Sequence, residues 1–215
     1  TIHDWATPED MNWDRWMGGV NKKIPFNADH YFRWRKYYPY CAGLLGDLLP
    51  HLAHPFILAT GNPEFPSRVV SIGSKAWKTD RLTPGTYERD VDESVQVLAE
   101  FPSGFNLMLA SATVNEQGMT EMIRGHHGSL YMGGLSSTKI ELRPERKFAD
   151  EIDPETFDGL LPGEQIRHHE RNWLDCIRDG KEPNANIDLA VRVQTVISLA
   201  EMSDRLNIMC LFDEK

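Results

Sequence analysis

The chain has 215 residues, of which 40% are hydrophobic and 26% are charged, as in an ordinary globular protein that is large enough to bury a core. Its formal net charge of −9 at pH 7 would repel phosphate backbones, so nucleic acid is not expected as a partner. We recognise no transmembrane stretch and no signal peptide, and therefore expect no membrane partner. Three widely spaced cysteines, Cys41, Cys176 and Cys210, suggest neither a metal site nor a disulfide framework.

The N-terminal part of the sequence has a helical and aromatic pattern. Because the sequence begins at Thr1 rather than at a methionine, we expect that a preceding segment is missing from it. Residues 8–19, PEDMNWDRWMGG, predict a short helix with a glycine pair past its end. Residues 42–55, AGLLGDLLPHLAHP, carry leucines around most of a helix and predict burial on more than one side. A proline inside this stretch predicts a kink, or two helices that meet at Leu49-Pro50.

From Arg68 to Leu142 the apolar residues alternate with a period of two, which predicts strands. Residues 94–113, SVQVLAEFPSGFNLMLASAT, alternate on both sides of a PSG turn and predict a β-hairpin. Further short strands with glycine turns extend this to an antiparallel meander, one face of which helices can cover. Residues 163–206 again predict helices, with a C-terminal signal at Gly180. The order helix, meander, helix predicts an α+β domain.

Several signatures of nucleotide-binding and hydrolytic enzymes are absent from the sequence. It contains no G-x-G-x-x-G, no Walker loop, no G-x-S-x-G elbow and no H-E-x-x-H. We therefore expect no cofactor to bind to this chain alone through a recognised phosphate cradle.

Asp47 and His51 are four residues apart and would share one face of a regular helix. An imidazole can take a proton from a substrate hydroxyl near neutral pH, and a carboxylate one turn away can fix its tautomer or bind a second hydroxyl. A helix-surface pair or a satisfied core pair is the competing interpretation, and spacing alone favours it. His54 extends the set to three possible metal ligands, but Pro50 should distort that face and no fourth ligand is recognisable.

Residues 32–40, FRWRKYYPY, mix aromatic rings with cations. Sugar sites favour such a mixture, because ring faces cover C–H surfaces and polar tips bind hydroxyls. Arg33, Arg35, Tyr38 and Tyr40 are therefore candidate substrate-binding residues. The alternative is a packed aromatic segment with solvated cations, which is the more frequent arrangement when no other context is available.

Three motifs resemble the Gfo/Idh/MocA oxidoreductases, the family of glucose–fructose oxidoreductase and inositol dehydrogenase. AGLLGDLLPHLAHP is similar to the family's glycine-rich D-x-x-x-H helix, NWDRWMGG to its tryptophan-rich segment, and residues 168–206 to its closing helices. The order and spacing agree across nearly the whole chain. Many members carry TDWGxH where this chain has GDLLPH at residues 46–51, a departure that bears more on the substrate than on the family.

The resemblance implies that residues 1–215 are a single substrate-binding and oligomerisation domain, built on a large, mainly antiparallel open sheet with helices on one face. An N-terminal Rossmann domain, which binds NAD or NADP in the family, would be missing. The family's roles make His51 the acid/base and Asp47 a substrate ligand in the oxidation of a sugar or polyol hydroxyl. The family's catalytic lysine belongs to the Rossmann domain and GKEP at residues 180–183 is a different motif, so this chain alone is expected to be inactive.

Two other functions stay open at this level: a cofactor-less binding or assembly module, and a metal-dependent lyase or hydrolase that uses Asp47, His51 and His54. The strands also predict a homodimer or homotetramer through the sheet, because Leu98 and Met108 are apolar residues on the face opposite the predicted core. The resemblance points the same way, although residues 143–165 or the missing domain could cover that face instead.

Overall fold

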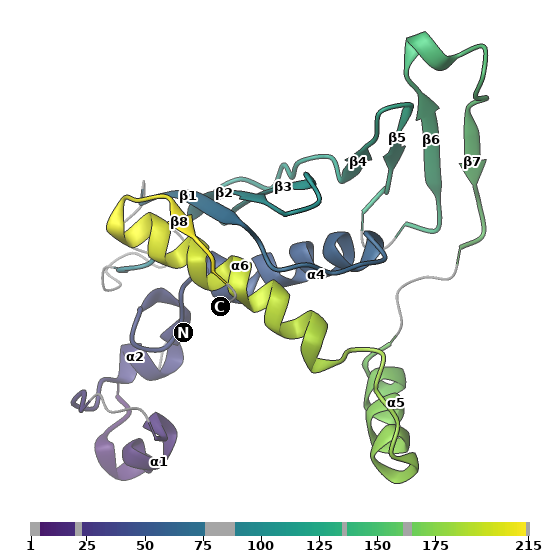
Figure 1. Cartoon of the computed structure of the whole chain (residues 1–215). Coiled ribbons are helices and arrows are strands. Elements are labelled where there is room, and N and C mark those ends of the chain that lie inside the picture. Colours follow the sequence, from purple (N-terminus) through teal and green to yellow (C-terminus); the bar gives the residue numbers. More distant parts are fainter. Residues whose placement is uncertain (1–4, 20–22, 76–88, 135–136, 161–164, 214–215) are drawn as a thin grey trace. The chain divides into compact units, whose positions relative to one another are not determined.

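A computed structural model describes residues 5–19, 23–75, 89–134, 137–160 and 165–213. The single domain expected over residues 1–215 comprises two compact units, Thr1–Glu116 with Arg192–Lys215 and Gln117–Val191. The α+β class is confirmed, and every strand pairing in the described residues is antiparallel. The strands form two four-stranded sheets, one in each unit (Figure 1). None of the helices in these residues is long and apolar enough to cross a membrane.

The first unit begins with short helical pieces held together by aromatic rings. The helix predicted over residues 8–19 is divided into a 3-10 turn and a five-residue α-helix that ends at Gly18, where φ is 65°. The Trp13 indole stacks on Trp16 with ring centroids 4.8 Å apart and donates a hydrogen bond of 2.7 Å to the Ile24 carbonyl. These contacts fix the segment where its helices are too short to be stable alone. The elements are η1 (Pro8–Asp10), α1 (Trp13–Met17), α2 (Ala28–Phe32) and η2 (Trp34–Lys36).

The leucine-rich stretch at residues 42–55 forms two helices rather than one kinked helix, which is one of the two arrangements that the sequence predicted. Helix α3 (Leu44–Asp47) ends at Leu48, and α4 (Leu49–Ala59) begins immediately after it. Pro50 occupies the first turn of α4, where a missing N–H breaks no helical hydrogen bond. Helix α4 buries residues at four-residue intervals, namely Leu49, Ala53 and Ile57.

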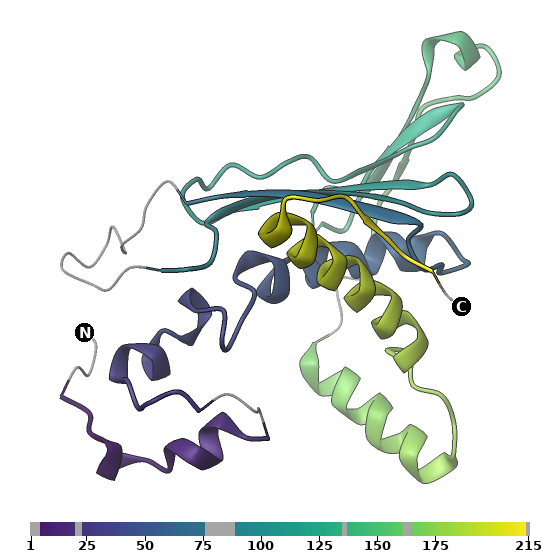
Figure 2. The same ribbon diagram turned by 60° about the vertical axis from the view of Figure 1, so that its left-hand side comes forward.

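The first sheet has the strand order β3-β2-β1-β8 and confirms the predicted hairpin as β2 and β3. Val97 and Leu109 pair across the hairpin and are buried, whereas the next pair, Leu98 and Met108, faces the opposite way and is about half exposed. Helices α4 and α6 lie along the buried face of this sheet, as Figures 1 and 2 show. The bounds are β1 (Arg68–Ser74), β2 (Ser94–Glu100), β3 (Asn106–Ala112), α6 (Ile187–Leu206) and β8 (Cys210–Leu211).

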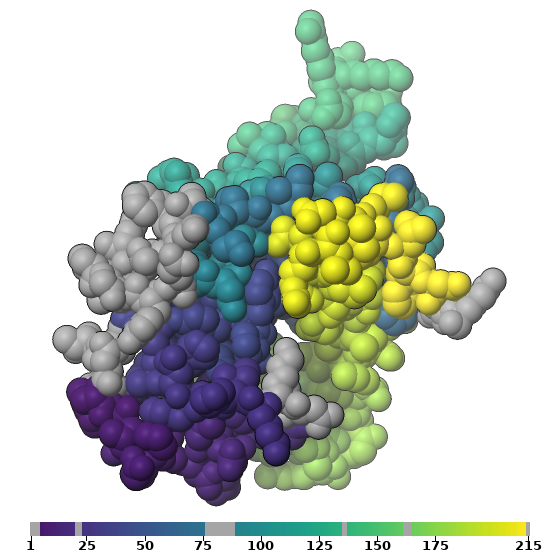
Figure 3. Space-filling model, turned by 90° about the vertical axis from the view of Figure 1, so that its left-hand side faces the viewer, coloured from purple at the N-terminus to yellow at the C-terminus, as the bar shows by residue number. Residues whose placement is uncertain are grey.

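The end of α6 is tied to the sheet by a buried serine. The Ser203 hydroxyl accepts a hydrogen bond from the Ser71 amide at 2.9 Å and donates one to the Ile208 carbonyl at 2.5 Å. The chain then reverses at Asn207, where φ is 54°, and β8 pairs with β1. Figure 3 shows this C-terminal segment in yellow beside the blue of the β1 region.

The second unit contains the continuing meander and one long helix. Its sheet follows chain order, β4-β5-β6-β7, as a meander must. The glycine signal is confirmed, because α5 ends at Gly180 in the left-handed conformation with φ of 64°. The elements are β4 (Met122–Arg124), β5 (Gly128–Tyr131), β6 (Ile140–Pro144), η3 (Arg146–Phe148), β7 (Glu155–Phe157) and α5 (Ile166–Asp179).

Candidate functional site

The candidate acid and base lie at the junction of α3 and α4. Asp47 is the last residue of α3, and His51 is in the first turn of α4. Gly43 sets the direction of α3: its φ is 59°, and a Cβ there would lie 2.7 Å from the Val91 Cβ. Only glycine fits both the backbone angle and this close approach. The chain therefore presents the junction from a tightly constrained turn.

Arg35 holds the carboxylate of Asp47. Its Nε donates a hydrogen bond of 2.9 Å to Asp47 Oδ2, and the two side chains are 58% and 29% exposed. The guanidinium carbon also lies 4.1 Å from the ring centroid of Trp34. Two predicted site residues, twelve positions apart in sequence, are thus in direct contact at the surface. A solvated cation–carboxylate pair of this kind can exchange partners with a hydroxyl-bearing ligand at small energetic cost.

His51 follows Asp47 by four residues in the sequence and its side chain is exposed, but it belongs to a different helix from Asp47. Its amide donates to the Leu48 carbonyl at 3.2 Å, and within the described part of the chain no hydrogen bond or ion pair holds its imidazole. The break at Leu48 interrupts the single helix face that four-residue spacing would give. His54 is half-buried, and no three His, Cys, Asp or Glu side chains among the described residues are arranged to hold a metal ion.

Arg33, a second candidate, belongs to a buried network. Its guanidinium pairs with the carboxylate of Asp29, which also accepts a hydrogen bond from the Tyr37 hydroxyl. Asp29 is only 2% exposed. Burial, reinforced by the hydrogen bond to Asp29, raises the pKa of the Tyr37 phenol well above its usual value. Asp29 was not among the predicted residues, although its i,i+4 spacing to Arg33 on a helix was a usable signal.

The two candidate tyrosines contact other parts of the first unit. The Tyr38 amide donates to the Asp90 carboxylate at 2.8 Å, and the Arg205 guanidinium lies 4.7 Å from its ring centroid. Burial raises the pKa of the Tyr38 phenol to about 12. The Tyr40 hydroxyl lies 2.9 Å from His30 Nδ1, within the aromatic cluster of the N-terminal helices. Neither tyrosine has a hydrogen bond to Asp47 or His51 among the described contacts.

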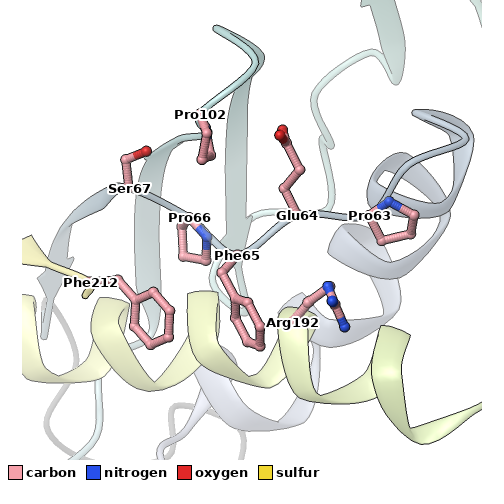
Figure 4. A pocket seen from close by; sticks show the side chains of 8 residues that line it. All are labelled: Pro63, Glu64, Phe65, Pro66, Ser67, Pro102, Arg192 and Phe212. Carbon is pink, nitrogen blue, oxygen red and sulfur yellow. The ribbon is translucent and has the colours of Figure 1, made fainter. Parts of the chain in front are cut away.

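A crevice of about 310 Å³ lies elsewhere in the first unit (Figure 4). Phe65 and Phe212 stack inside it with centroids 5.0 Å apart, and the Arg192 guanidinium covers Phe65 at 4.7 Å. Neither Asp47 nor His51 lines it, so this hollow and the candidate acid/base residues do not coincide. Its lining residues are Pro63, Glu64, Phe65, Pro66, Ser67, Pro102, Arg192 and Phe212.

Comparison with known protein families matches most of the chain. The model described as "Oxidoreductase family, C-terminal alpha/beta domain" matches residues 17–207, a range that includes the α3–α4 junction, both sheets' central strands and all of α6. No curated protein sequence is significantly similar to the chain.

Solved structures show the same fold at low sequence identity. An NAD-binding oxidoreductase from Klebsiella pneumoniae has a TM-score of 0.67 and 16% identity, covering 90% of this chain and 55% of that one. The aldose-aldose oxidoreductase from Caulobacter crescentus, complexed with glycerol, has a TM-score of 0.61 and 19% identity, covering 83% and 50%. A levoglucosan dehydrogenase in complex with NADH and levoglucosan has a TM-score of 0.62 and 15% identity, covering 85% and 54%. The chain spans about half the length of each of these structures.

Proposed function

This chain belongs to the Gfo/Idh/MocA oxidoreductase family, as its C-terminal α/β domain, and from that premise we propose that it is the substrate-binding half of a nicotinamide-dependent enzyme that oxidises a sugar or polyol hydroxyl. Two relatives of the same fold support the substrate class, since one was solved with levoglucosan and NADH and the other with glycerol. Both ligands carry hydroxyl groups on neighbouring carbons. The remainder of the parent protein would hold the cofactor.

The observation that carries the proposal is the exposed junction of α3 and α4. There, Arg35 Nε donates a hydrogen bond of 2.9 Å to the Asp47 carboxylate. His51 lies in the next helix, just after the break at Leu48. A general base needs access to the substrate, and the exposed side chain of His51 has that access. Asp47 would accept a hydrogen bond from a second substrate hydroxyl and so orient the reacting one.

In the proposed reaction the substrate alcohol becomes a carbonyl. The hydroxyl proton passes to the His51 imidazole, and the adjacent carbon loses a hydride. A nicotinamide bound outside this chain would supply the hydride acceptor. We expect the cofactor to bind outside this chain, because among the described elements α4 follows α3 and α6 follows α5, so neither begins after a strand and a glycine-rich turn, the arrangement that cradles a pyrophosphate.

The decisive substitution is His51→Asn in the intact parent enzyme. Turnover should fall about 100- to 10,000-fold, the usual contribution of a general acid–base group. The unfolding midpoint should not change, because His51 is exposed and its side chain makes no described polar contact. His126→Asn, in the exposed turn between β4 and β5, is the matched control and should retain full turnover. Normal turnover by a folded His51→Asn enzyme would refute the assignment.

A cofactor-binding measurement tests whether the nicotinamide site lies outside this chain, separately from the role of His51. Nicotinamide fluorescence should show saturable NADH binding to the parent protein and none to the 215-residue chain. Saturable binding to the chain alone at micromolar cofactor would reveal a nucleotide site in it and contradict the proposed division of labour.

We also propose that the chain forms a homodimer through the uncovered face of its first sheet. Val70, Leu98 and Met108 are cross-strand neighbours in one row and are 37%, 52% and 51% exposed. Ile72 and Leu211 add exposed apolar area to the same sheet. A flat face with this many exposed apolar side chains is rare on soluble monomers. The same face of a second copy of the chain can cover it about a two-fold axis.

Light scattering tests the dimer. The chain has a mass of 24.6 kDa, so a stable dimer should have a mass of about twice that value. Leu98→Lys should shift the mass to that of the monomer, because it places a charge in the centre of the row. Gln96→Lys, on the same face of the same strand but polar already, should leave the dimer intact. A wild-type chain that stays monomeric at high concentration would refute the proposal.

A further inference from the structure

Trp34 lies against the guanidinium that holds the Asp47 carboxylate. The guanidinium carbon of Arg35 is 4.1 Å from the centroid of the Trp34 ring, and its Nε donates a hydrogen bond of 2.9 Å to Asp47 Oδ2. One guanidinium therefore contacts the indole through its flat face and the carboxylate through its edge. All three residues belong to the first unit, so these contacts are internal to it.

The indole contact matters because an arginine side chain is long and flexible. An ion pair near the surface must hold two side chains in one geometry, and this entropic cost offsets much of the attraction. Stacking on an aromatic face restricts the guanidinium to a plane before it meets its carboxylate. Without the indole, Arg35 would sample other directions, and the Asp47 carboxylate would lose the donor that fixes it.

The turn that carries Trp34 is anchored at both ends. Arg33, just before it, pairs with the buried carboxylate of Asp29. The Trp34 carbonyl accepts a hydrogen bond of 3.1 Å from the Tyr37 amide, which closes η2. The Tyr37 hydroxyl donates to the same Asp29 carboxylate. The half-buried Trp34 ring is thus presented by a turn that is fixed independently of the guanidinium stacked on it.

We propose that Trp34 is a positioning residue for the Asp47 carboxylate and acts on it through Arg35. The inference rests on the proposed function, in which Asp47 orients the substrate. Arg35 occupies Oδ2 of this carboxylate, and no hydrogen bond to Oδ1 is found among the described residues. By keeping Arg35 on Oδ2, the indole leaves Oδ1 as the acceptor for a substrate hydroxyl. In this role Trp34 contacts the guanidinium and not the substrate.

The first test is kinetic and uses the intact parent enzyme. Trp34→Leu should raise the KM for a polyol substrate about fivefold, the factor expected for a cation–π contact near the surface, with a smaller change in kcat. Trp34→Phe keeps an aromatic face and should restore most of the lost affinity. In an Arg35→Gln background Trp34→Leu should raise KM no further, because the group through which the indole acts is gone. Trp34→Met, which has no ring face, replaces Trp34→Leu if that variant does not fold.

The second unit provides a matched control. There the guanidinium carbon of Arg143 lies 3.9 Å from the centroid of the Tyr131 ring, and its Nη2 donates a hydrogen bond of 2.6 Å to Glu141. The arrangement of ring, guanidinium and carboxylate is the same, but this carboxylate is not a proposed substrate ligand. Tyr131→Leu should therefore leave both KM and kcat unchanged.

The second test does not depend on turnover and uses the 215-residue chain. The Arg35 Nε–H resonance, assigned by its loss in Arg35→Gln, should be protected from exchange with solvent because this group donates to Asp47. Trp34→Leu should speed its exchange about fivefold, by loss of the same contact, and Trp34→Phe should not. Equal exchange of this group in the wild type and in both variants would overturn the proposal.

The outcomes separate this inference from the proposed function. A parent enzyme that oxidises a polyol with the same KM in the wild type and in Trp34→Leu retains the function and overturns the role of Trp34. The same holds for a KM rise that persists in full in the Arg35→Gln background, or that Trp34→Phe does not reverse. A parent that oxidises no sugar or polyol overturns both. A KM rise that requires Arg35, together with faster Nε–H exchange, supports the proposal.

Discussion

Two arginine–carboxylate pairs, both drawn from the segment between Asp29 and Asp47, have opposite surroundings. Arg33 and Asp29 are 11% and 1% exposed at their side chains, and the Tyr37 hydroxyl completes their network. Arg35 and Asp47 are 58% and 29% exposed and have water on one side. The same residue types thus give a structural core pair in one case and an accessible surface pair in the other. Burial, rather than residue type, separates the architectural role from the candidate functional one.

The energetics of the two pairs differ for the same reason. Removing one partner of a buried pair leaves a charge without compensation, which typically costs about 3–5 kcal/mol. An exposed pair contributes about 0.2–1 kcal/mol, because water screens it and its side chains lose freedom when they pair. The first pair should therefore control stability, and the second should control ligand binding with little effect on stability.

Asp29→Asn should give the largest loss of stability. The Arg33 guanidinium would stay buried without its carboxylate, so the free energy of unfolding should fall by about 3 kcal/mol or more. Urea denaturation followed by circular dichroism measures this change. Asp14→Asn, an exposed residue of α1, is the control and should change stability by less than about 0.5 kcal/mol. If Asp29→Asn changed stability as little as the Asp14→Asn control, burial would not be what distinguishes the two pairs.

Gly43→Ala should come next, since it strains the turn that presents Asp47. Alanine would have to adopt φ of 59° with its Cβ 2.7 Å from the Val91 side chain. We expect a loss of about 2 kcal/mol in unfolding free energy, together with reduced turnover of the parent enzyme. Gly46→Ala is a matched control within α3: its Cβ would meet only Ala42 at 3.4 Å, and stability should stay equal or rise slightly. Equal effects of the two substitutions would contradict this interpretation.

The sequence predicted the hairpin and the helix break well, because both follow from local chemistry. Alternation in residues 94–113 gave the buried pair Val97 and Leu109, and Pro50 marked the position of the break. The division of the strands into two sheets could not be predicted, because it depends on pairing partners rather than on period.

Pairings within the candidate site were less predictable. Arg33 and Arg35 both neighbour Trp34 in the sequence, but Arg33, between α2 and η2, pairs with Asp29, and Arg35, within η2, pairs with Asp47. The sequence pattern predicted the same substrate-binding role for both arginines, because the direction of a side chain at a short 3-10 turn depends on the packing around it. The expected shared face of Asp47 and His51 also assumed a continuous helix, which the break at Leu48 removes.

Asp92→Asn should give a smaller, pH-dependent effect on stability. Burial, followed by a hydrogen bond to Asp204, raises the pKa of Asp92 to about 6 from an ordinary value of 3.8. The Asp204 carboxylate is fixed by the Gly73 amide at 2.6 Å, so the two acids are held together.

The sign of the pH dependence follows from proton binding. Between about pH 4 and 6 the folded state binds more protons than the unfolded state, so the free energy of unfolding falls as pH rises through this window. An amide at position 92 keeps the hydrogen bond without the second charge. Above pH 6 the variant should be more stable than the wild type by about 1 kcal/mol, a value reduced for the partial exposure of the pair. Denaturation midpoints at pH 4.0 and 7.5 check it, and parallel curves for the two proteins would contradict it.

Arg35→Gln should have the smallest effect on stability. It tests the exposed pair of the comparison, Arg35 with Asp47. Its ion pair with Asp47 is exposed, and the unfolding free energy should change by less than about 0.5 kcal/mol. In the parent enzyme, however, Asp47 would lose the group that orients it, so the substrate KM should rise while kcat changes less. Arg68→Gln, which breaks an exposed pair with Glu100 on the sheet, is the control and should change neither constant. If Arg35→Gln destabilised the protein as Asp29→Asn does, the Asp47 pair would be architectural, and the exposed junction would no longer mark a substrate site.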